Sequence, residues 1–136
     1  MLIQTSLSLC TLRPWHSGDQ EDLVNHANNR KVWRNLTDRF PHPYTNADAQ
    51  NWLGIANEAD RSHHLAIAYA GKAIGGVGAI AGEGIARQTA QFGYWLGETY
   101  WGKGIASAAT SSFLAYLEAL GEFSRLEAPV FAWNPV

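Results

Sequence analysis

The chain has 136 residues, of which 46% are apolar and 16% charged, so it can fill the core of one globular domain. Its net charge of −2 and the lack of a Lys/Arg run provide no surface for nucleic acid. Cys10 is the only cysteine, which excludes an internal disulfide and a zinc site built on several cysteines, and no metal is expected. No apolar run reaches membrane-spanning length and no signal peptide is apparent, so we expect a cytoplasmic protein with no membrane contact.

The first half of the chain predicts one strand followed by helices. Residues 5–15 alternate apolar and polar side chains, which is typical of a half-buried strand that ends at Pro14. A helix is predicted over 17–30, capped by Ser17 or Asp19, and a short second helix over 31–40. The prolines of Pro41–Tyr44 predict an extended loop, after which Thr45 or Asn46 caps a helix over 47–60.

The second half predicts a strand meander, a long helix and a last strand. Residues 63–70 and 73–81 form a hairpin around a Gly71–Lys72 turn, and the glycines within 75–78 indicate a bulge or a close approach. A third strand covers Thr89–Gly97. An apolar stripe from Ile105 to Leu120 predicts a helix that Gly121 ends. This helix joins the third strand to a parallel last strand, Arg125–Trp133, which gives an α+β fold.

Gly102 and Gly104 stand directly before this helix, and two interpretations of them remain open. The first turn of a helix has unpaired N–H donors and about half a positive charge from the dipole, so glycines here can form a cradle for phosphate. They can equally serve as a tight turn with nothing bound. A P-loop is excluded because Gly104 follows Lys103, and a Rossmann fingerprint because a third glycine is missing.

The segment "GYWLGETYWGKGIASAAT" resembles the acetyl-CoA-binding segment of the GNAT acetyltransferases, in particular the RimJ/RimL-type branch. The superfamily pattern [Q/R]-x-x-G-x-[G/A] falls on residues 101–106, with Trp101 in place of Gln/Arg. "LRPW", "PYTNADAQNWL" and "RLEAPVFAWN" agree in order, so the resemblance covers nearly the whole chain. It implies a mixed, mostly antiparallel sheet with helices on both sides and a parallel strand pair that splays apart for CoA.

The resemblance also implies the residues that bind acetyl-CoA. The pyrophosphate would lie on the backbone N–H groups of Gly102, Lys103, Gly104, Ile105 and Ala106. Pantetheine would pair with the strand Phe92–Leu96 (Phe92, Gly93, Tyr94, Trp95, Leu96), beside the partner strand Leu126–Trp133, and Asn134 would touch the cofactor arm.

One departure from the family pattern concerns the C-terminus. The family continues past this Asn with a helix and two more strands, whereas the sequence ends at Val136, so we expect a single GNAT domain over 1–136 that is truncated there. A last strand without its usual neighbours also predicts a homodimer that pairs through the exposed strand.

The expected reaction is acetyl transfer from acetyl-CoA to a primary amine, either a protein N-terminus or a small molecule, without a covalent intermediate. The thioester carbonyl would be polarised by N–H groups at a bulge in Phe92–Leu96. Glu98 and Glu83 are the predicted catalytic residues, and His63 or His64 is a further candidate for the base. Predicted to line the acceptor site are Trp33 and Tyr44, together with Trp52, Tyr94 and Trp95. The alternative function is a non-catalytic module that binds acyl-CoA or a protein.

Overall fold

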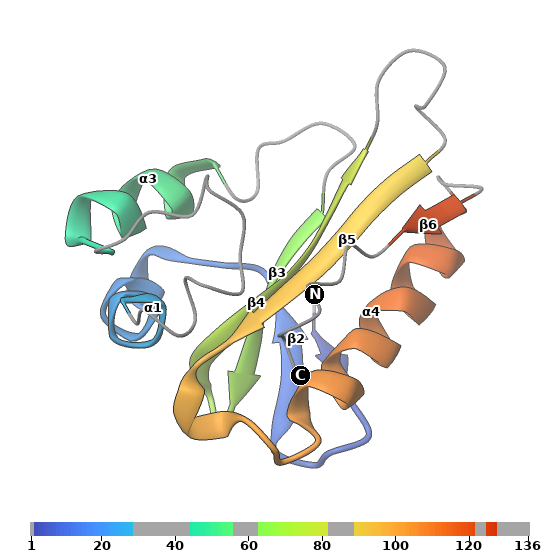
Figure 1. The fold of residues 1–136 in the computed structure, drawn as a ribbon, viewed down its shortest axis with the longest axis horizontal. Coiled ribbons are helices and arrows are strands. Elements are labelled where there is room, and N and C mark those ends of the chain that lie inside the picture. The colour runs from blue at the N-terminus through green and yellow to red at the C-terminus, as the bar shows by residue number, and fades with distance from the viewer. Residues whose placement is uncertain (1, 29–43, 56–62, 82–88, 122–124, 128–136) are drawn as a thin grey trace.

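The computed structural model describes residues 2–28, 44–55, 63–81, 89–121 and 125–127 (Figure 1). In these residues six strands form a single sheet in the order β1-β2-β3-β4-β5-β6. Neighbouring strands are antiparallel except β5 and β6, which run parallel. The strands are β1 Ile3–Gln4, β2 Cys10–Arg13, β3 His63–Tyr69, β4 Lys72–Ala81, β5 Thr89–Leu96 and β6 Arg125–Glu127.

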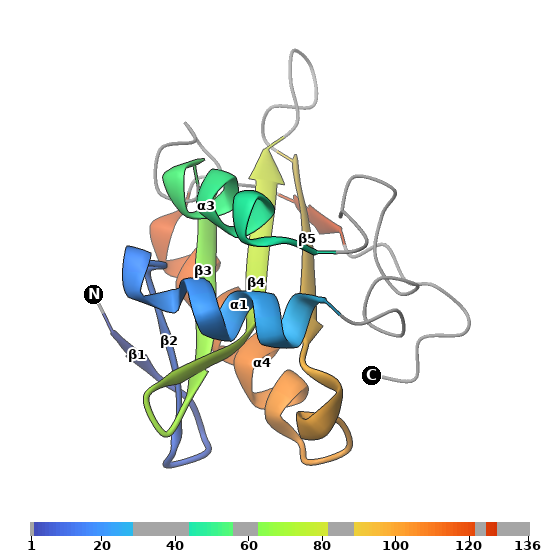
Figure 2. The same cartoon turned by 90° about the vertical axis from the view of Figure 1, so that its left-hand side faces the viewer.

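Helices cover both faces of the sheet, as predicted. α1 (Gln20–Ala27) and α3 (Asn46–Ile55) lie across one face, and α4 (Ile105–Leu120) lies on the other (Figure 2). The α4 side of the core contains Cys10, Leu12, Leu65, Ile67, Ile74, Val77, Ala79, Leu96, Ile105, Ala106, Ala109, Phe113 and Leu117. The α1/α3 side contains Trp15, Leu23, Ala27, Tyr44, Ala49, Ala66 and Ala73. The mixed α+β class is therefore confirmed.

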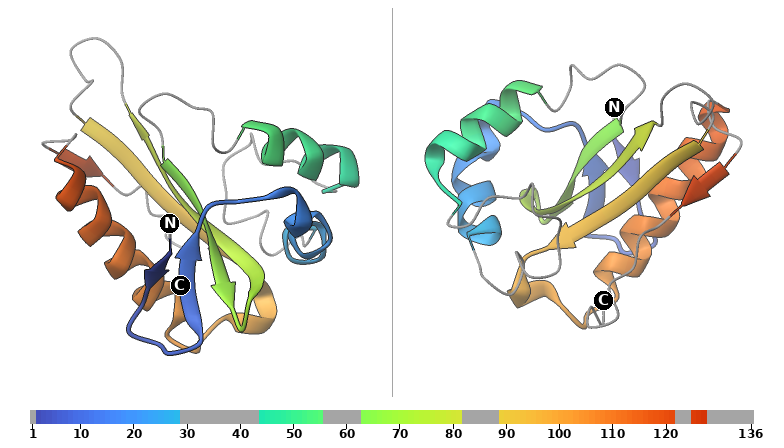
Figure 3. Two further views of the ribbon diagram at one scale, coloured as in Figure 1. Left: turned by 180° about the vertical axis from the view of Figure 1, so that it is seen from behind. Right: turned by 45° about the horizontal axis from the view of Figure 1, so that its top comes forward.

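The connection from β5 through α4 to β6 positions the predicted cofactor site. Thr89–Gln91 of β5 pairs in parallel with Arg125–Glu127. Both views in Figure 3 show β6 beside the first half of β5, near the C-terminal end of α4. Gly121 ends α4 in the left-handed conformation at φ 68°, as predicted. The predicted apolar stripe of α4 is buried or half-buried except at Leu120, which is 40% exposed.

The predicted strand over residues 5–15 is wrong in its first half. β2 begins only at Cys10, and residues 5–9 form the turn of a small hairpin with β1. Thr5 Oγ1 donates to the Cys10 carbonyl at 2.8 Å, and the Cys10 N–H donates to the Leu7 carbonyl at 3.0 Å. These local hydrogen bonds turn the chain, and Leu9 is left 53% exposed despite its place in the apolar alternation.

The hairpin between β3 and β4 is confirmed, but its turn lies one residue earlier than predicted. Tyr69 pairs with Lys72, so Ala70 and Gly71 form the two-residue turn, with φ of 51° and 86°. Positive φ at both central residues matches the right-handed twist of the strands. The register then shifts, because Ile67 faces Gly75 while Ala68 faces Ala73, which leaves Ile74 as a bulge in β4.

Asp19 precedes α1 as predicted, but its side chain makes no capping hydrogen bond there. Its carboxylate instead accepts two hydrogen bonds from Arg13 at 2.8 and 2.9 Å, and one from the His16 N–H at 3.0 Å. Burial alone would raise the pKa of Asp19, but these hydrogen bonds and the Arg13 charge lower it below its ordinary value. The pair ties the end of β2 to the start of α1.

Several predictions lie outside the described residues. These are the short helix over 31–40, most of the Pro41–Tyr44 loop and the last strand beyond Glu127.

Candidate functional site

The turn between β5 and α4 presents bare backbone. Gly102 and Gly104 have φ of 74° and 77°, in the left-handed region, and both are exposed. A Cβ atom added at either position would meet no described atom within 4 Å. Gly104 is the N-cap of α4, and no side chain caps the helix in the described residues. The first N–H groups of α4 thus have no side-chain cap among the described residues, as an anion cradle requires.

Trp101 holds this turn against the strand it follows. Its indole Nε1 donates to the carbonyl of Leu96, the last residue of β5, at 2.8 Å. Residues 98–100 form a short 3-10 helix, in which the Tyr100 N–H donates to Gly97 and the Trp101 N–H to Glu98. Lys103 lies with its Nζ 5.6 Å from the centroid of the Tyr100 ring. The sequence pattern predicted the turn but not the hydrogen bond from Trp101 to Leu96, because the pattern assigns no partner to a Trp in the Gln/Arg position.

The predicted bulge in Phe92–Leu96 is absent. β5 pairs with β4 without a shift, from Ala90 opposite Ala81 to Leu96 opposite Gly75. The bulge lies in β4 at Ile74, whose carbonyl accepts the Gly97 N–H at 2.8 Å and so keeps the β4–β5 ladder continuous. Alternating aromatic and small residues define the faces of β5 but carry no information about its register.

The two faces of β5 differ. Phe92, Tyr94 and Leu96 contact the α4 side of the core, whereas Trp95 packs on the α1/α3 side. The Tyr94 hydroxyl is buried and has no hydrogen-bond partner among the described residues, and burial raises the pKa of this phenol. A buried donor of this kind is available to a bound molecule.

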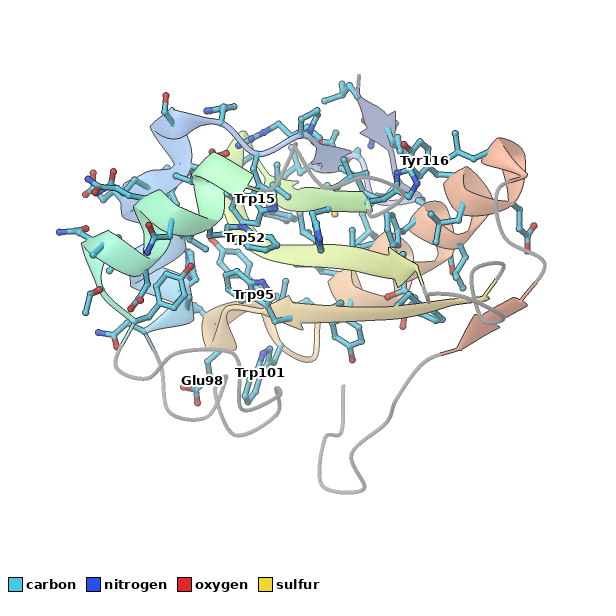
Figure 4. The ribbon with its side chains drawn as sticks, turned by 90° about the horizontal axis from the view of Figure 1, so that it is seen from above. Trp15, Trp52, Trp95, Glu98, Trp101 and Tyr116 are labelled. Carbon is cyan, nitrogen blue, oxygen red and sulfur yellow. The ribbon has the colours of Figure 1, made fainter. Side chains whose placement is uncertain are left out.

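Four rings gather on the α1/α3 face. Trp15 stacks on Trp95 with centroids 6.5 Å apart and planes at 9°, and Trp52 of α3 meets Trp15 edge-on, also at 6.5 Å. Trp52 also contacts His64 of β3 edge-on at 4.8 Å. Figure 4 shows the three tryptophans beside α3, with Glu98 and Trp101 beyond the end of β5. Trp15 is only 2% exposed, while Trp52, Trp95 and His64 are half-buried.

The glycines of β4 are the reason these rings fit. A Cβ at Gly76 would lie 2.9 Å from the Trp95 Nε1 and 3.1 Å from the Trp15 ring, and one at Gly78 would lie 2.7 Å from the His64 Nδ1. A Cβ at Gly75 would collide with the Trp95 carbonyl oxygen. The predicted close approach at these glycines is therefore confirmed, and the approaching groups are rings and a neighbouring strand.

The structure brings some of the predicted site residues together and places others apart: His64, Trp52 and Trp95 share the α1/α3 face, whereas Glu98 and His63 lie elsewhere. Glu98 is half-buried at the start of the 3-10 helix, next to the glycine turn. His63 contacts Tyr116 of α4 and His64 contacts Trp52 of α3, so the two histidines face opposite sides of the sheet. Tyr44 is 4% exposed within the core, where burial and then the Asp48 charge raise its pKa to about 12. Glu83, Trp33 and Asn134 lie outside the described residues.

His26 is a residue near this site that the sequence did not single out. Its ring lies over Gly97, where any Cβ would collide with it, and meets Tyr100 edge-on at 5.6 Å. Burial lowers the pKa of His26, against an opposing effect of Asp22. No local pattern links residue 26 with residue 97, because only the packing of α1 on the sheet brings them together.

Other kinds of site find little support in the described part of the chain. No group of three or more His, Cys, Asp or Glu side chains is placed to hold a metal there. None of the helices described is both long and apolar enough to cross a membrane. A hollow of about 360 Å³ is lined by Gly18, Gln20, Glu21, Val24, Asn25 and Asn46, none of which is a predicted site residue.

Comparisons with known proteins identify one family. A family model described as "Acetyltransferase (GNAT) domain" matches residues 10–136. No curated protein matches the sequence. Among solved structures, a GNAT-family acetyltransferase from Bacillus anthracis superposes with a TM-score of 0.81 at 18% identity, covering 98% of this chain and 76% of that one.

Two further solved structures were determined with cofactor bound. The microcin C7 self-immunity acetyltransferase MccE, in complex with acetyl-CoA and AMP, has a TM-score of 0.76 at 23% identity, covering 94% of this chain and 73% of that one. RimL, a ribosomal L7/L12 alpha-N-protein acetyltransferase in complex with coenzyme A, has a TM-score of 0.77 at 19% identity, covering 98% and 77%. At these identities the structural likeness shows a shared fold.

Proposed function

The chain belongs to the GNAT acetyltransferase family, and we propose that it is an N-acetyltransferase that uses acetyl-CoA to acetylate a primary amine on a small molecule or a protein N-terminus. The observation that carries this proposal is the turn before α4, where two exposed glycines have positive φ and no side chain caps the helix in the described residues. The relatives solved with acetyl-CoA and coenzyme A support the same cosubstrate here. We also propose a single domain over 1–136.

The residues of the turn fit a pyrophosphate. Because Gly102 and Gly104 have no Cβ, an anion could reach the N–H groups of Gly102, Lys103, Gly104, Ile105 and Ala106. The helix dipole adds a favourable field, and the exposed Lys103 adds a positive charge. A side chain at either glycine would fill the space that the anion needs.

Pantetheine would then extend from the turn along β5, beside Phe92, Gly93, Tyr94, Trp95 and Leu96. In the described residues, β6 pairs only with Thr89–Gln91, which precede this stretch. The buried Tyr94 hydroxyl is a donor that could serve the cofactor on the α4 side. Asn134 remains our proposed contact to the cofactor arm.

When bound, acetyl-CoA supplies an activated thioester carbonyl that a neutral amine can attack directly. The chain must orient the amine and remove its protons. We propose that Glu98, and with it Glu83, relays a proton from the incoming ammonium to solvent through water. Trp33 and Tyr44 remain our proposed acceptor-site residues, Tyr44 acting from within the core.

We place the chain in the RimJ/RimL-type branch, on the segment at residues 93–110 and on the likeness to RimL. RimL is described as a ribosomal L7/L12 alpha-N-protein acetyltransferase, and MccE as a microcin C7 self-immunity acetyltransferase. A protein N-terminus and a small-molecule amine are therefore the two acceptor classes to compare.

A thiol-release assay with acetyl-CoA and a mixture of amines tests this function. We expect release of free thiol that depends on both the chain and an amine. Binding of acetyl-CoA without thiol release would favour the alternative, a non-catalytic acyl-CoA-binding or protein-binding module, over an enzyme.

Replacing Glu98 with Gln tests the proposed proton relay. We expect Glu98→Gln to lower kcat/KM on the order of 10² because the amide cannot take a proton. The affinity for acetyl-CoA, measured by calorimetry, should stay almost unchanged. An unaltered rate and pH profile would remove Glu98 from the mechanism.

We also propose a homodimer that pairs through the last strand. Within the described sheet β6 has a strand neighbour on one side only, and such an edge favours pairing with another chain. Light scattering that gives a monomer mass at high concentration would contradict this.

A further inference from the structure

A row of three paired residues crosses the sheet on the face that α3 covers. His64 of β3 pairs with Gly78 of β4, and Gly78 pairs with Gly93 of β5. The His64 ring meets Trp52 of α3, which fixes the face. Neighbouring strands are about 4.8 Å apart, so the Cα atom of Gly93 lies roughly 10 Å from that of His64.

The His64 ring covers Gly78 in the middle of this row, whereas no described side chain covers Gly93 at its end. The His64 ring covers Gly78, because a Cβ there would lie 2.7 Å from Nδ1 and 3.3 Å from Cε1. Gly93 is exposed although it lies in an inner strand, and a Cβ added to it would meet no described atom within 4 Å. The imidazole therefore reaches from β3 toward an open space above β5.

The adjacent row closes one side of this space. There Ala66 pairs with Gly76, and Gly76 with Trp95, whose indole lies back over Gly76 against Trp15. The space above Gly93 thus has Trp95 beside it along β5, and the His64 ring and Trp52 across β4. These walls are flat aromatic rings, and their polar atoms are the two nitrogens of His64 and the indole N–H groups of Trp52 and Trp95.

Among the described residues, no acidic or basic side chain forms an ion pair with this imidazole. Thr45 donates to the carboxylate of Asp48 at the start of α3, and Arg13 of β2 is paired with Asp19. Of the other described titratable groups, Lys72 lies at the hairpin end of β4, His63 and Tyr94 lie on the α4 face, Tyr44 is buried in the α1/α3 core, and His26 lies over Gly97.

We infer that His64 is a proton acceptor at the reacting amine, which would sit above Gly93 between the imidazole and Trp95. This inference rests on the proposed function, since it assumes that the thioester lies along β5. The inference also narrows the class of acceptor in the proposed function, because flat aromatic walls favour an amine that is attached to an apolar or aromatic group.

Glu98 and His64 can then accept different protons of the acceptor ammonium. Leu96 is three residues from Gly93, or roughly 10 Å along the strand, and Glu98 lies beyond that end. An ammonium acceptor must lose two protons in all. One leaves before attack, through water toward Glu98. The second leaves the nitrogen as the C–N bond forms and passes to His64, while the C–S bond breaks and its electron pair stays on sulfur. The thiolate finally takes a proton from the imidazolium, which gives amide and free thiol.

The protonation state of His64 agrees with this role. Burial, and to a lesser extent the nearby His63, lower the pKa of His64 below its ordinary 6.5. The imidazole is therefore neutral at pH 7 and can accept a proton.

The experiment compares wild type with His64→Gln, using His16→Gln as the control, because His16 is an exposed histidine outside the proposed site. Thiol release from acetyl-CoA is followed from pH 5 to 9 with 2-phenylethylamine, spermidine and short peptides. We expect His64→Gln to lower kcat/KM on the order of 10² and to remove the fall in rate below pH 6.5, with acetyl-CoA affinity retained. His16→Gln should keep both the wild-type rate and the fall in rate below pH 6.5. We also expect 2-phenylethylamine to be the best of these acceptors.

A second readout does not depend on turnover or on the folding of a variant. Proton–carbon NMR of the wild-type imidazoles in the presence of coenzyme A should show the His64 signal shifting when 2-phenylethylamine is added, with the His63 signal unmoved. A His64 signal that does not move would overturn the inference, as would a His64→Gln enzyme with the wild-type rate and pH profile. A wild type that releases no thiol with any of these amines would overturn the proposed function itself.

Discussion

Gly104 tests at the scale of one residue whether the turn before α4 holds an anion. Gly104→Val should weaken coenzyme A binding by roughly tenfold or more, because a β-branched side chain both disfavours φ 77° and fills the open space. Gly71→Val is the matched control: Gly71 has φ 86° and equally open surroundings, but lies in the β3–β4 turn. Both variants should lose comparable stability in urea, and only Gly104→Val should lose affinity in calorimetry. Equal affinities in the two variants would argue against the cradle.

At the scale of one element, α3 depends on a reciprocal cap. The Asp48 N–H donates to Thr45 Oγ1 at 3.2 Å, and the Asp48 carboxylate accepts from the Thr45 N–H at 3.0 Å. Thr45→Ala should lower the free energy of unfolding by about 1 kcal/mol, and Thr45→Ser should restore most of it. The measurement is the midpoint of urea unfolding, compared between variants whose free energy of unfolding depends equally steeply on urea concentration. Since α3 carries Trp52, loosening this helix should also change Trp fluorescence; a Thr45→Ala midpoint equal to that of wild type would refute the cap.

For the whole molecule, two histidines predict how stability depends on pH. The pKa values of His26 and His64 are lowered by burial, so between the ordinary 6.5 and their folded values the unfolded chain binds more protons than the folded one. Stability should therefore be full above pH 6.5 and fall as the pH drops through the folded values. Asp19, whose pKa is lowered from 3.8, adds a separate loss only below that value. Urea unfolding between pH 3 and 8 measures both steps, and a flat profile between pH 7 and 5 would contradict the first.

Local residue types were sufficient to predict much of the fold and the glycine turn before α4. Thr45, Gly104 and Gly121 act within one turn of the chain, so their helix ends could be predicted from the sequence. The same holds for the α4 stripe, the β3–β4 hairpin and the α+β order of elements, because periodicity and turn chemistry are short-range properties.

What only the structure decided depends either on competing local hydrogen bonds or on contacts between distant residues. The alternation at residues 5–9 predicted a strand, yet local hydrogen bonds of Thr5 and Cys10 made a turn. The position of the bulge followed from the pairing of Gly97 with Ile74, which a single strand does not encode. Neighbouring His63 and His64 looked equivalent in sequence, but in an extended strand successive side chains point to opposite faces. Only the packing of α3 on one face and α4 on the other shows that His64, and not His63, lies on the same face as Gly93.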